Sequence, residues 1–202
     1  MIVFLFGCDT GKTIFKNKKH PLQITNSPDL DDREVRKYVL SIAINDEKLR
    51  KQSTETSTIS FLFHPPNIYK PYTGWVKQIH ENGQVWGLGR YLAGKLEGSL
   101  TIWRKTGQKW KEVHFRKGVK DGRWTAWYEN GQKAEEGFYG DGSKEGLWTS
   151  WQQTGQKWRE VHFRAGQKDG VCRYFNKNAA EDHREIYKAG FLIRDNDLIF
   201  AN

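Results

Sequence analysis

From about residue 74 onward, short runs of aromatic and β-branched residues alternate with polar, glycine-containing segments. The segment Gly122-Arg-Trp-Thr-Ala-Trp-Tyr-Glu129 is typical of a strand, because these side chains suit a pleated surface. Asn130-Gly131 predicts a two-residue hairpin turn, in which both central residues have positive φ. Gln132–Tyr139 predicts the returning strand, and Gly140–Gly146 predicts the turn into the next hairpin.

This hairpin pattern recurs every 24 residues, which three series of glycines and two series of aromatic residues demonstrate. The glycine series are Gly83, Gly107, Gly131 and Gly155; Gly94, Gly118, Gly142, Gly166 and Gly190; and Gly74, Gly98, Gly122, Gly146 and Gly170. The aromatic series are Trp103, Trp127, Trp151 and Phe175, and Tyr91, Phe115, Tyr139, Phe163 and Tyr187.

The repeat predicts an all-β fold, an elongated single-layer antiparallel sheet of five stacked hairpins. Ten strands should lie between Gly74 and Phe191 and extend about 45–50 Å. A lone hairpin is not stable in water, so neighbouring hairpins must cover one another's aromatic residues. We expect a curved sheet with a concave aromatic face, and the hairpin tips should fall at Gly83, Gly107, Gly131 and Gly155.

The chain divides by composition into five parts. We expect residues 1–8 to end a lipoprotein signal, 9–32 to be a polar tether, 33–73 a lead-in, 74–191 the repeats and 192–202 a tail. Within the lead-in, residues 33–51 fit either a helix or an extended pair, and Ser57–Phe63 predicts a strand.

The start of the chain, Leu5-Phe6-Gly7-Cys8, resembles the lipobox of bacterial lipoproteins, in which the cysteine thiol is acylated. Only seven residues precede Cys8 and none is charged, whereas a signal needs a basic start and a longer apolar run. We therefore expect the reading frame to begin upstream. The alternative is a short apolar first strand with an incidental cysteine.

Charge and aromatic residues concentrate in the repeats. All nine Trp lie between Trp75 and Trp158, and residues 74–190 carry a net charge of +7 despite 14 acidic side chains. A basic surface favours anionic lipid, nucleic acid or an acidic protein, and also serves solubility. No nucleic-acid motif occurs, so nucleic acid is not the expected partner. Two cysteines form no metal-binding spacing, and no apolar run is long enough for a membrane helix.

Two segments, Gln108–Gly122 and Gln156–Gly170, are near copies, while the unit between them differs. Either a block of two hairpins was duplicated, or the array repeats a binding surface every 48 residues. Alternation along a strand places Trp110 and His114 on one face and Lys111 on the other. The candidate binding residues are Trp110, Lys111, His114 and Arg116, and their equivalents Trp158, Arg159, His162 and Arg164.

We expect no catalytic residue, metal site or cofactor. His114 and His162 should lie about 19 Å apart, too far to share a metal. Acidic residues recur in every unit, whereas a catalytic pair is a single unequal arrangement in a pocket. They are therefore assigned to turns and cross-strand pairs. These residues are Glu112, Glu136 and Glu160, and Glu97, Asp121, Glu145 and Asp169.

The motif Gly122-x-Trp-x-x-Trp-Tyr-x-Asn-Gly-Gln-Lys133, with Tyr139-x-x-Gly142-x-x-x-Gly146, resembles the MORN-repeat family. The residues resemble especially the variant in bacterial proteins that are often labelled antitoxin-like, and the resemblance covers about residues 68–191. The resemblance implies a scaffold or binding role without an active site. The fifth unit departs from the pattern at Cys172, Phe175 and Ala179, as expected of a terminal cap.

These observations favour a non-catalytic scaffold that binds another protein through an aromatic and basic sheet face, at the bacterial envelope. Trp, Tyr and Arg dominate binding energy at protein interfaces. Two alternatives stay open: a cytoplasmic antitoxin-like partner that masks a toxin, and a peripheral module that binds anionic lipid.

The lipoprotein hypothesis predicts that protein made from its native start enters the detergent phase on phase partitioning. Cys8→Ser should move it to the aqueous phase, because the acyl chain supplies the anchoring. Native protein that stays aqueous, from a gene without an upstream start that encodes a basic and apolar stretch, would contradict the hypothesis.

Overall fold

The computed structural model describes residues 3–4, 15–16, 30–45, 50–52, 62–64 and 71–193. It divides into two compact units, residues 1–42 and 43–202, which are considered separately. The predicted acylation site Cys8, most of the predicted tether and most of the C-terminal tail lie outside the described residues.

The first unit holds two short strands and a helix. Strands β1 (Val3–Phe4) and β2 (Phe15–Lys16) pair antiparallel, and helix α1 spans Arg33–Ile42. Asp32 caps the helix, since its Oδ1 accepts hydrogen bonds from the N–H groups of Glu34 and Val35 at 2.8 and 3.0 Å. The two readings left open for this segment are therefore decided in favour of a helix over Arg33–Ile42.

The second unit contains a large sheet and a small one. The small sheet pairs β4 (Arg50–Gln52) with β5 (Leu62–His64), and β5 overlaps the strand predicted at Ser57–Phe63. At the N-terminal edge of the large sheet, β3 (Ile44–Asn45) pairs parallel with β6 (Gly74–Ile79).

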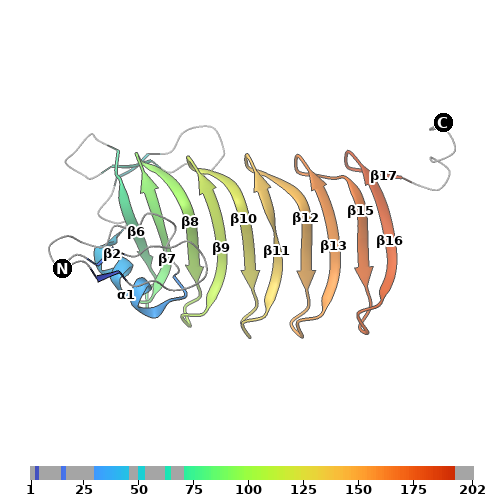
Figure 1. The fold of residues 1–202 in the computed structure, drawn as a ribbon, viewed down its shortest axis with the longest axis horizontal. Helices are drawn as coiled ribbons and strands as arrows, with labels where there is room; N and C mark the ends of the chain where they lie inside the picture. The colour runs from blue at the N-terminus through green and yellow to red at the C-terminus, as the bar shows by residue number, and fades with distance from the viewer. Residues whose placement is uncertain are drawn as a thin grey trace. The chain divides into compact units, whose positions relative to one another are not determined.

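The repeats form one open sheet whose strands follow chain order, as predicted (Figure 1). Asp169 divides the ninth repeat strand into β14 and β15, and β17 adds a further strand at the C-terminal edge. After β6 the strands are β7 (Val85–Leu92), β8 (Lys95–Trp103), β9 (Lys109–Arg116), β10 (Val119–Trp127), β11 (Lys133–Gly140), β12 (Ser143–Trp151), β13 (Lys157–Arg164), β14 (Gln167–Lys168), β15 (Gly170–Phe175), β16 (Glu181–Lys188) and β17 (Phe191–Ile193).

Gly83, Gly107, Gly131 and Gly155 lie in the hairpin tips as predicted, but the predicted turn type is wrong. Between β10 and β11 only Gly131 has positive φ, at 83°. The Tyr128 carbonyl accepts from the Gly131 N–H at 3.1 Å, and the Tyr128 N–H donates to the Gln132 carbonyl at 2.8 Å. This is a three-residue loop, a type I turn followed by a glycine in the left-handed region, and a β-bulge follows it.

The two-residue turns with two positive φ values occur at the opposite edge of the sheet. They are Ala93-Gly94, Lys117-Gly118, Asp141-Gly142, Ala165-Gly166 and Ala189-Gly190. A non-glycine residue is strained in this conformation. Hydrogen bonds to the preceding repeat offset the strain. The Glu145 carboxylate accepts from the Ala165 N–H at 2.9 Å, and the Lys144 carbonyl accepts from the Gly166 N–H at 2.9 Å.

The register defines two faces of the sheet, because directly opposite residues point to the same side. The Trp148 face carries the buried Val76, Val113, Trp148, Val161 and Cys172 along one row. The Thr125 face carries a row in which threonine alternates with glutamate: Thr101, Glu112, Thr125, Glu136, Thr149 and Glu160. Trp124 lies on the Trp148 face and Trp127 on the Thr125 face.

Trp148 is the largest fully buried side chain among the described residues, at 2% exposed. Its ring centroid lies 5.3 Å from that of Trp124 and 5.2 Å from that of Tyr139. Its Nε1 donates to the Phe138 carbonyl at 3.1 Å. The ring covers Gly137, where any Cβ would overlap it. Glycine on one strand therefore makes room for tryptophan on the next.

Gly137→Ala should lower the free energy of unfolding by about 1–3 kcal/mol, because the new methyl group collides with the Trp148 ring. Gly140→Ala is the matched control on the same strand. Its Cβ would meet nothing closer than Glu145 Cβ at 3.8 Å, and its φ is not in the left-handed region. We expect a change within about 0.5 kcal/mol there. Urea denaturation measures both, and equal losses would refute the packing argument.

Candidate functional site

A β-bulge next to each hairpin tip positions the predicted tryptophans. Ile102 pairs with Lys111 and Trp103 with Lys109, so Trp110 is an extra residue on β9. The same skip leaves Trp158 extra on β13, where Ser150 pairs with Arg159 and Trp151 with Lys157. A bulge changes the direction of a side chain and interrupts the alternation of faces.

The bulge overturns the predicted orientation of Trp110. We expected Lys111 on the opposite face, but its Nζ lies 4.1 Å from the Trp110 ring centroid. Arg104 contributes a second cation, with its Cζ 5.4 Å from the same centroid. Lys111 pairs with Ile102 and Ala126, which places this cluster on the Trp148 face.

Trp158 repeats the arrangement four strands further along the sheet. The Cζ of Arg159 lies 4.6 Å from the Trp158 ring centroid, and both tryptophans are partly buried. At about 4.8 Å per strand, the two aromatic–cation pairs are about 19 Å apart. They form two equivalent positions on one face.

Glu135 occupies the middle unit between these two pairs, at the repeat position of Lys111 and Arg159. Its Oε1 lies 3.5 Å from Arg159 Nη2 and 3.7 Å from Lys144 Nζ. Ser150 Oγ also donates to this oxygen at 3.4 Å. The Glu135 carboxylate therefore links neighbouring repeats on the Trp148 face through ion pairs and a hydrogen bond.

Lys144 stands among aromatic rings. Its Nζ lies 3.7 Å from the Trp148 ring centroid and 5.2 Å from that of Phe163. Burial lowers the pKa of this ammonium, and the nearby Glu135 carboxylate opposes that shift. Burial, with a smaller contribution from Glu135, raises the pKa of Tyr139. The Trp148 face thus combines aromatic surface with cations that are partly removed from water.

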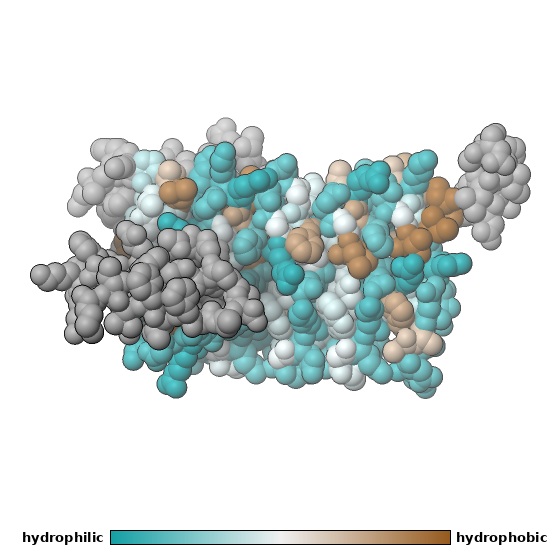
Figure 2. All heavy atoms as spheres, viewed as in Figure 1, coloured by the Kyte–Doolittle hydropathy of each residue, from teal (hydrophilic) through white to brown (hydrophobic). Residues whose placement is uncertain are grey.

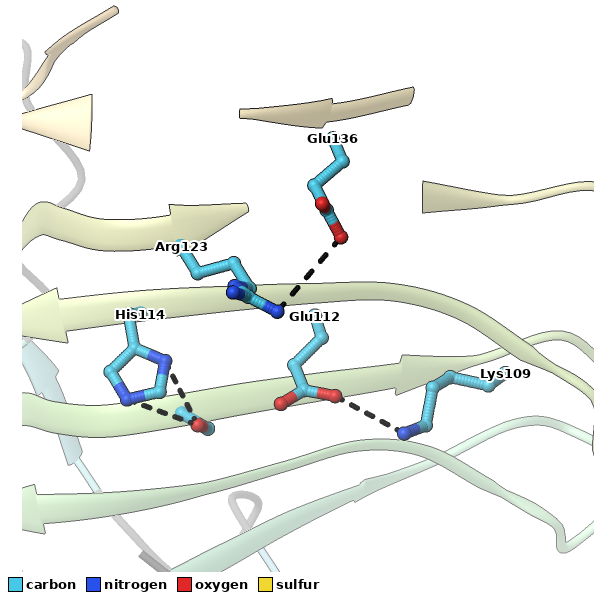
Figure 3. A network of polar contacts seen from close by, with 6 residues as sticks. Lys109, Glu112, His114, Arg123 and Glu136 are labelled. Atoms are coloured by element: carbon cyan, nitrogen blue, oxygen red, sulfur yellow. Dashed lines mark hydrogen bonds and ion pairs between the residues drawn. The ribbon is translucent and has the colours of Figure 1, made fainter. Parts of the chain in front are cut away.

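The other predicted residues do not join this cluster. His114 pairs with Ser99 on the Thr125 face, and its Nδ1 lies 3.1 Å from Ser99 Oγ (Figure 3). His162 Nδ1 lies 3.1 Å from the Val171 carbonyl oxygen, and Arg116 pairs with Asp121 and, at 3.6 Å, with Asp141. Arg164 is exposed at the end of β13. The predicted eight-residue surface is therefore divided between two faces.

The recurring glutamates of the Thr125 face form ion pairs within and between strands. Lys109, Lys133 and Lys157 each pair with the glutamate three residues later, at 3.1, 2.6 and 2.6 Å. Arg123 reaches Glu136 at 4.0 Å (Figure 3). These contacts match the structural role expected for the repeated acidic residues.

Exposed hydrophobic side chains also occur on the Thr125 face. Phe138, Leu147 and Ile186 are 48%, 41% and 40% exposed, and the register places all three on this side. Figure 2 shows hydrophobic atoms gathered over the C-terminal strands, bordered by hydrophilic ones. The Thr125 face therefore carries exposed apolar side chains in addition to its ion pairs.

Sequence reasoning missed one set of residues on the Trp148 face. Lys120, Lys144 and Lys168 recur every 24 residues, and each lies two positions before a glycine with positive φ (Gly122, Gly146 and Gly170). Their Nζ atoms lie 4.9, 5.2 and 4.3 Å from the ring centroids of Tyr139, Phe163 and Tyr187. The periodicity was visible in the sequence, but the pattern predicted a turn around Lys144, where a lysine is ordinarily solvent-exposed. In the structure all three lysines lie in strands.

Within the described part of the chain, no group of three or more His, Cys, Asp or Glu residues could hold a metal ion. No helix in that part is long and apolar enough to span a membrane.

Residues 120–141 match the family described as MORN repeat variant. The matched segment runs from β10 to the turn after β11 and contains one complete hairpin tip. Together with the repeated hairpins, the match supports the MORN-repeat family, whose repeats are generally non-enzymatic modules. No curated protein matches the sequence.

The geometry predicts different roles for the tryptophans. Trp148→Ala should lower the free energy of unfolding by about 3–5 kcal/mol, because it empties a buried site. Trp110→Ala and Trp158→Ala remove partly exposed rings and should each cost about 1–2 kcal/mol. Urea denaturation distinguishes them. Losses at Trp110 and Trp158 as large as that at Trp148 would assign both to the core and remove them from the binding face.

Proposed function

We propose that the repeat sheet is a non-catalytic scaffold that binds an acidic protein segment on the Trp148 face. The observation that carries this proposal is the pair of equivalent clusters, Trp110 with Lys111 and Trp158 with Arg159, on the same side of the sheet. Tryptophan and arginine are the residues most often found to dominate binding energy at interfaces.

The charge of this face supports an acidic partner. Among residues 71–193, the register and the contacts place Lys111, Lys120, Lys144, Arg159 and Lys168 on the Trp148 face. Glu135 and Glu185 are the acidic residues that the register places there. Complementary charge steers association and disfavours basic partners.

The Thr125 face is less suited to this role. Its lysines at positions 109, 133 and 157 already pair with glutamates at 3.1 Å or less. A ligand carboxylate would have to compete with these pairs. On the Trp148 face only Glu135 provides comparable internal pairing among the described residues.

Affinity capture from the native host tests the proposal. The double variant Trp110→Ala/Trp158→Ala should lose the partner that the wild-type protein retains, with about 2 kcal/mol or more of binding free energy lost at each anchor. Thermal melting must first show that the variant is folded.

Phe138→Ala is the matched control, because it removes an exposed aromatic ring from the Thr125 face. We expect it to keep the partner. Loss of the partner in Phe138→Ala, with retention in the double tryptophan variant, would move the interface to the Thr125 face and overturn the proposal.

A further inference from the structure

A row of alternating aromatic and lysine side chains crosses the Trp148 face. The register sets Lys120 opposite Phe115, Lys144 opposite Tyr139, and Lys168 opposite Phe163. Each lysine also reaches the corresponding ring of the next repeat, at 4.9, 5.2 and 4.3 Å. Each lysine is thus paired with an aromatic residue on the neighbouring strand, and its ammonium group lies over an aromatic ring of the next repeat.

The sheet fixes the spacing of these cations. Consecutive members are two strands apart, which is about 9.6 Å at the usual strand separation. Because each lysine is anchored over a ring, the spacing is more regular than that of free surface lysines. Among the described residues, Lys120 and Lys168 form no ion pair, while Glu135 contacts both Lys144 and Arg159.

Few polypeptide conformations match this period. A polyproline II helix has three residues per turn and a rise of about 3.1 Å, so every third side chain recurs on one side after about 9.3 Å. An extended strand presents the same side every second residue, after about 6.6 Å. An α-helix presents neighbours on one side after about 5–6 Å. Among these shortest same-side repeats, the polyproline II repeat lies nearest to two strand separations.

We propose that the acidic segment bound by this face adopts a polyproline II conformation, carries Asp or Glu at every third position, and lies across the strands along the lysine row. This inference rests on the proposed function and describes the part of the ligand that lies along the lysine row, five residues along the strands from Trp110 and Trp158. Carboxylates would bind Lys120, Lys144 and Lys168, and the intervening residues, proline above all, would pack on the aromatic rings, as proline-rich segments do in aromatic-lined grooves.

The environment of Lys144 favours such a ligand. Burial among rings lowers the pKa of its ammonium, so a carboxylate that approaches it stabilises a charge that is poorly hydrated. Glu135 would remain satisfied, since it is also within 3.5 Å of Arg159 and accepts from Ser150.

The row has a defined beginning. In the first repeat, the buried Leu96 occupies the position equivalent to these lysines. It packs with Phe115 and Tyr91 in an apolar cluster. Three cations therefore define the footprint, which corresponds to about seven residues of polyproline II ligand.

Fluorescence anisotropy with synthetic peptides tests the proposal on the whole protein. The probe is a labelled peptide of four Glu-Pro-Pro triplets. The control peptide has the same composition but two adjacent glutamate pairs, each followed by four prolines. We expect the periodic peptide to bind at least tenfold more tightly, with affinity that falls as salt is raised. Equal affinities would overturn the inference.

Three variants assign the contact. Lys144→Gln should weaken binding of the periodic peptide about threefold or more, and Lys144→Arg should preserve it within about twofold. Lys177→Gln removes the same charge from an exposed hairpin tip and should have no effect. Equal weakening by the Lys144 and Lys177 variants would overturn the row as the contact, because only net charge would then matter.

Binding of the protein to vesicles that contain phosphatidylserine tests whether anionic lipid is the ligand instead. Tight vesicle binding without preference for the periodic peptide would identify lipid as the ligand and overturn the inference. If the tryptophan double variant loses its native partner but the two peptides bind equally, the proposed function survives and only this description of its ligand fails.

Discussion

The hydrogen bonds that join the edge of each repeat to its neighbours are the constraint on which the rest of the structure depends. At one edge, the turn glycines Gly118, Gly142 and Gly166 donate to carbonyl oxygens 22 residues earlier, at 2.8–2.9 Å. At the hairpin tips, side chains of Arg104 and Tyr128 donate to carbonyl oxygens 23 residues later, at 3.0 and 2.8 Å. Polar groups at the edges of each repeat thereby form hydrogen bonds with the neighbouring repeat. The sheet therefore needs no second layer to define its geometry.

The 24-residue period was sufficient to predict the sheet, the strand order and the tip glycines, because hydrophobic spacing and turn residues agreed with one another. The turn types were harder to obtain. Asn130-Gly131 has the composition of a two-residue turn, yet Ala165-Gly166 adopts that conformation instead. The reason is tertiary, since Glu145 from the preceding repeat binds the strained N–H of Ala165. Local propensity contains no information about such a partner.

Only part of the candidate site was predicted, because here too the missing information lies in contacts between strands. The tryptophans and their cations were visible in the 48-residue recurrence, but strict alternation assigned Trp110 and Lys111 to opposite faces. One extra residue in the bulge brings them together, and leaves His114 on the other side. A bulge is a property of two paired strands, so a single strand's sequence cannot reveal it. The lysine row was missed because its role depends on aromatic rings 19 residues away in the sequence.

The placement of the bulge and turn contacts in every unit has an evolutionary consequence. The hydrogen bonds between neighbouring repeats join equivalent positions in successive repeats. A repeat duplicated within the gene could therefore form the same hydrogen bonds with the repeats on both sides of it. Insertion of 24 residues would lengthen the array by one step and leave the existing register unchanged. The array can therefore grow or shrink by whole repeats. Selection can change the length of the binding surface separately from the side chains that each repeat presents.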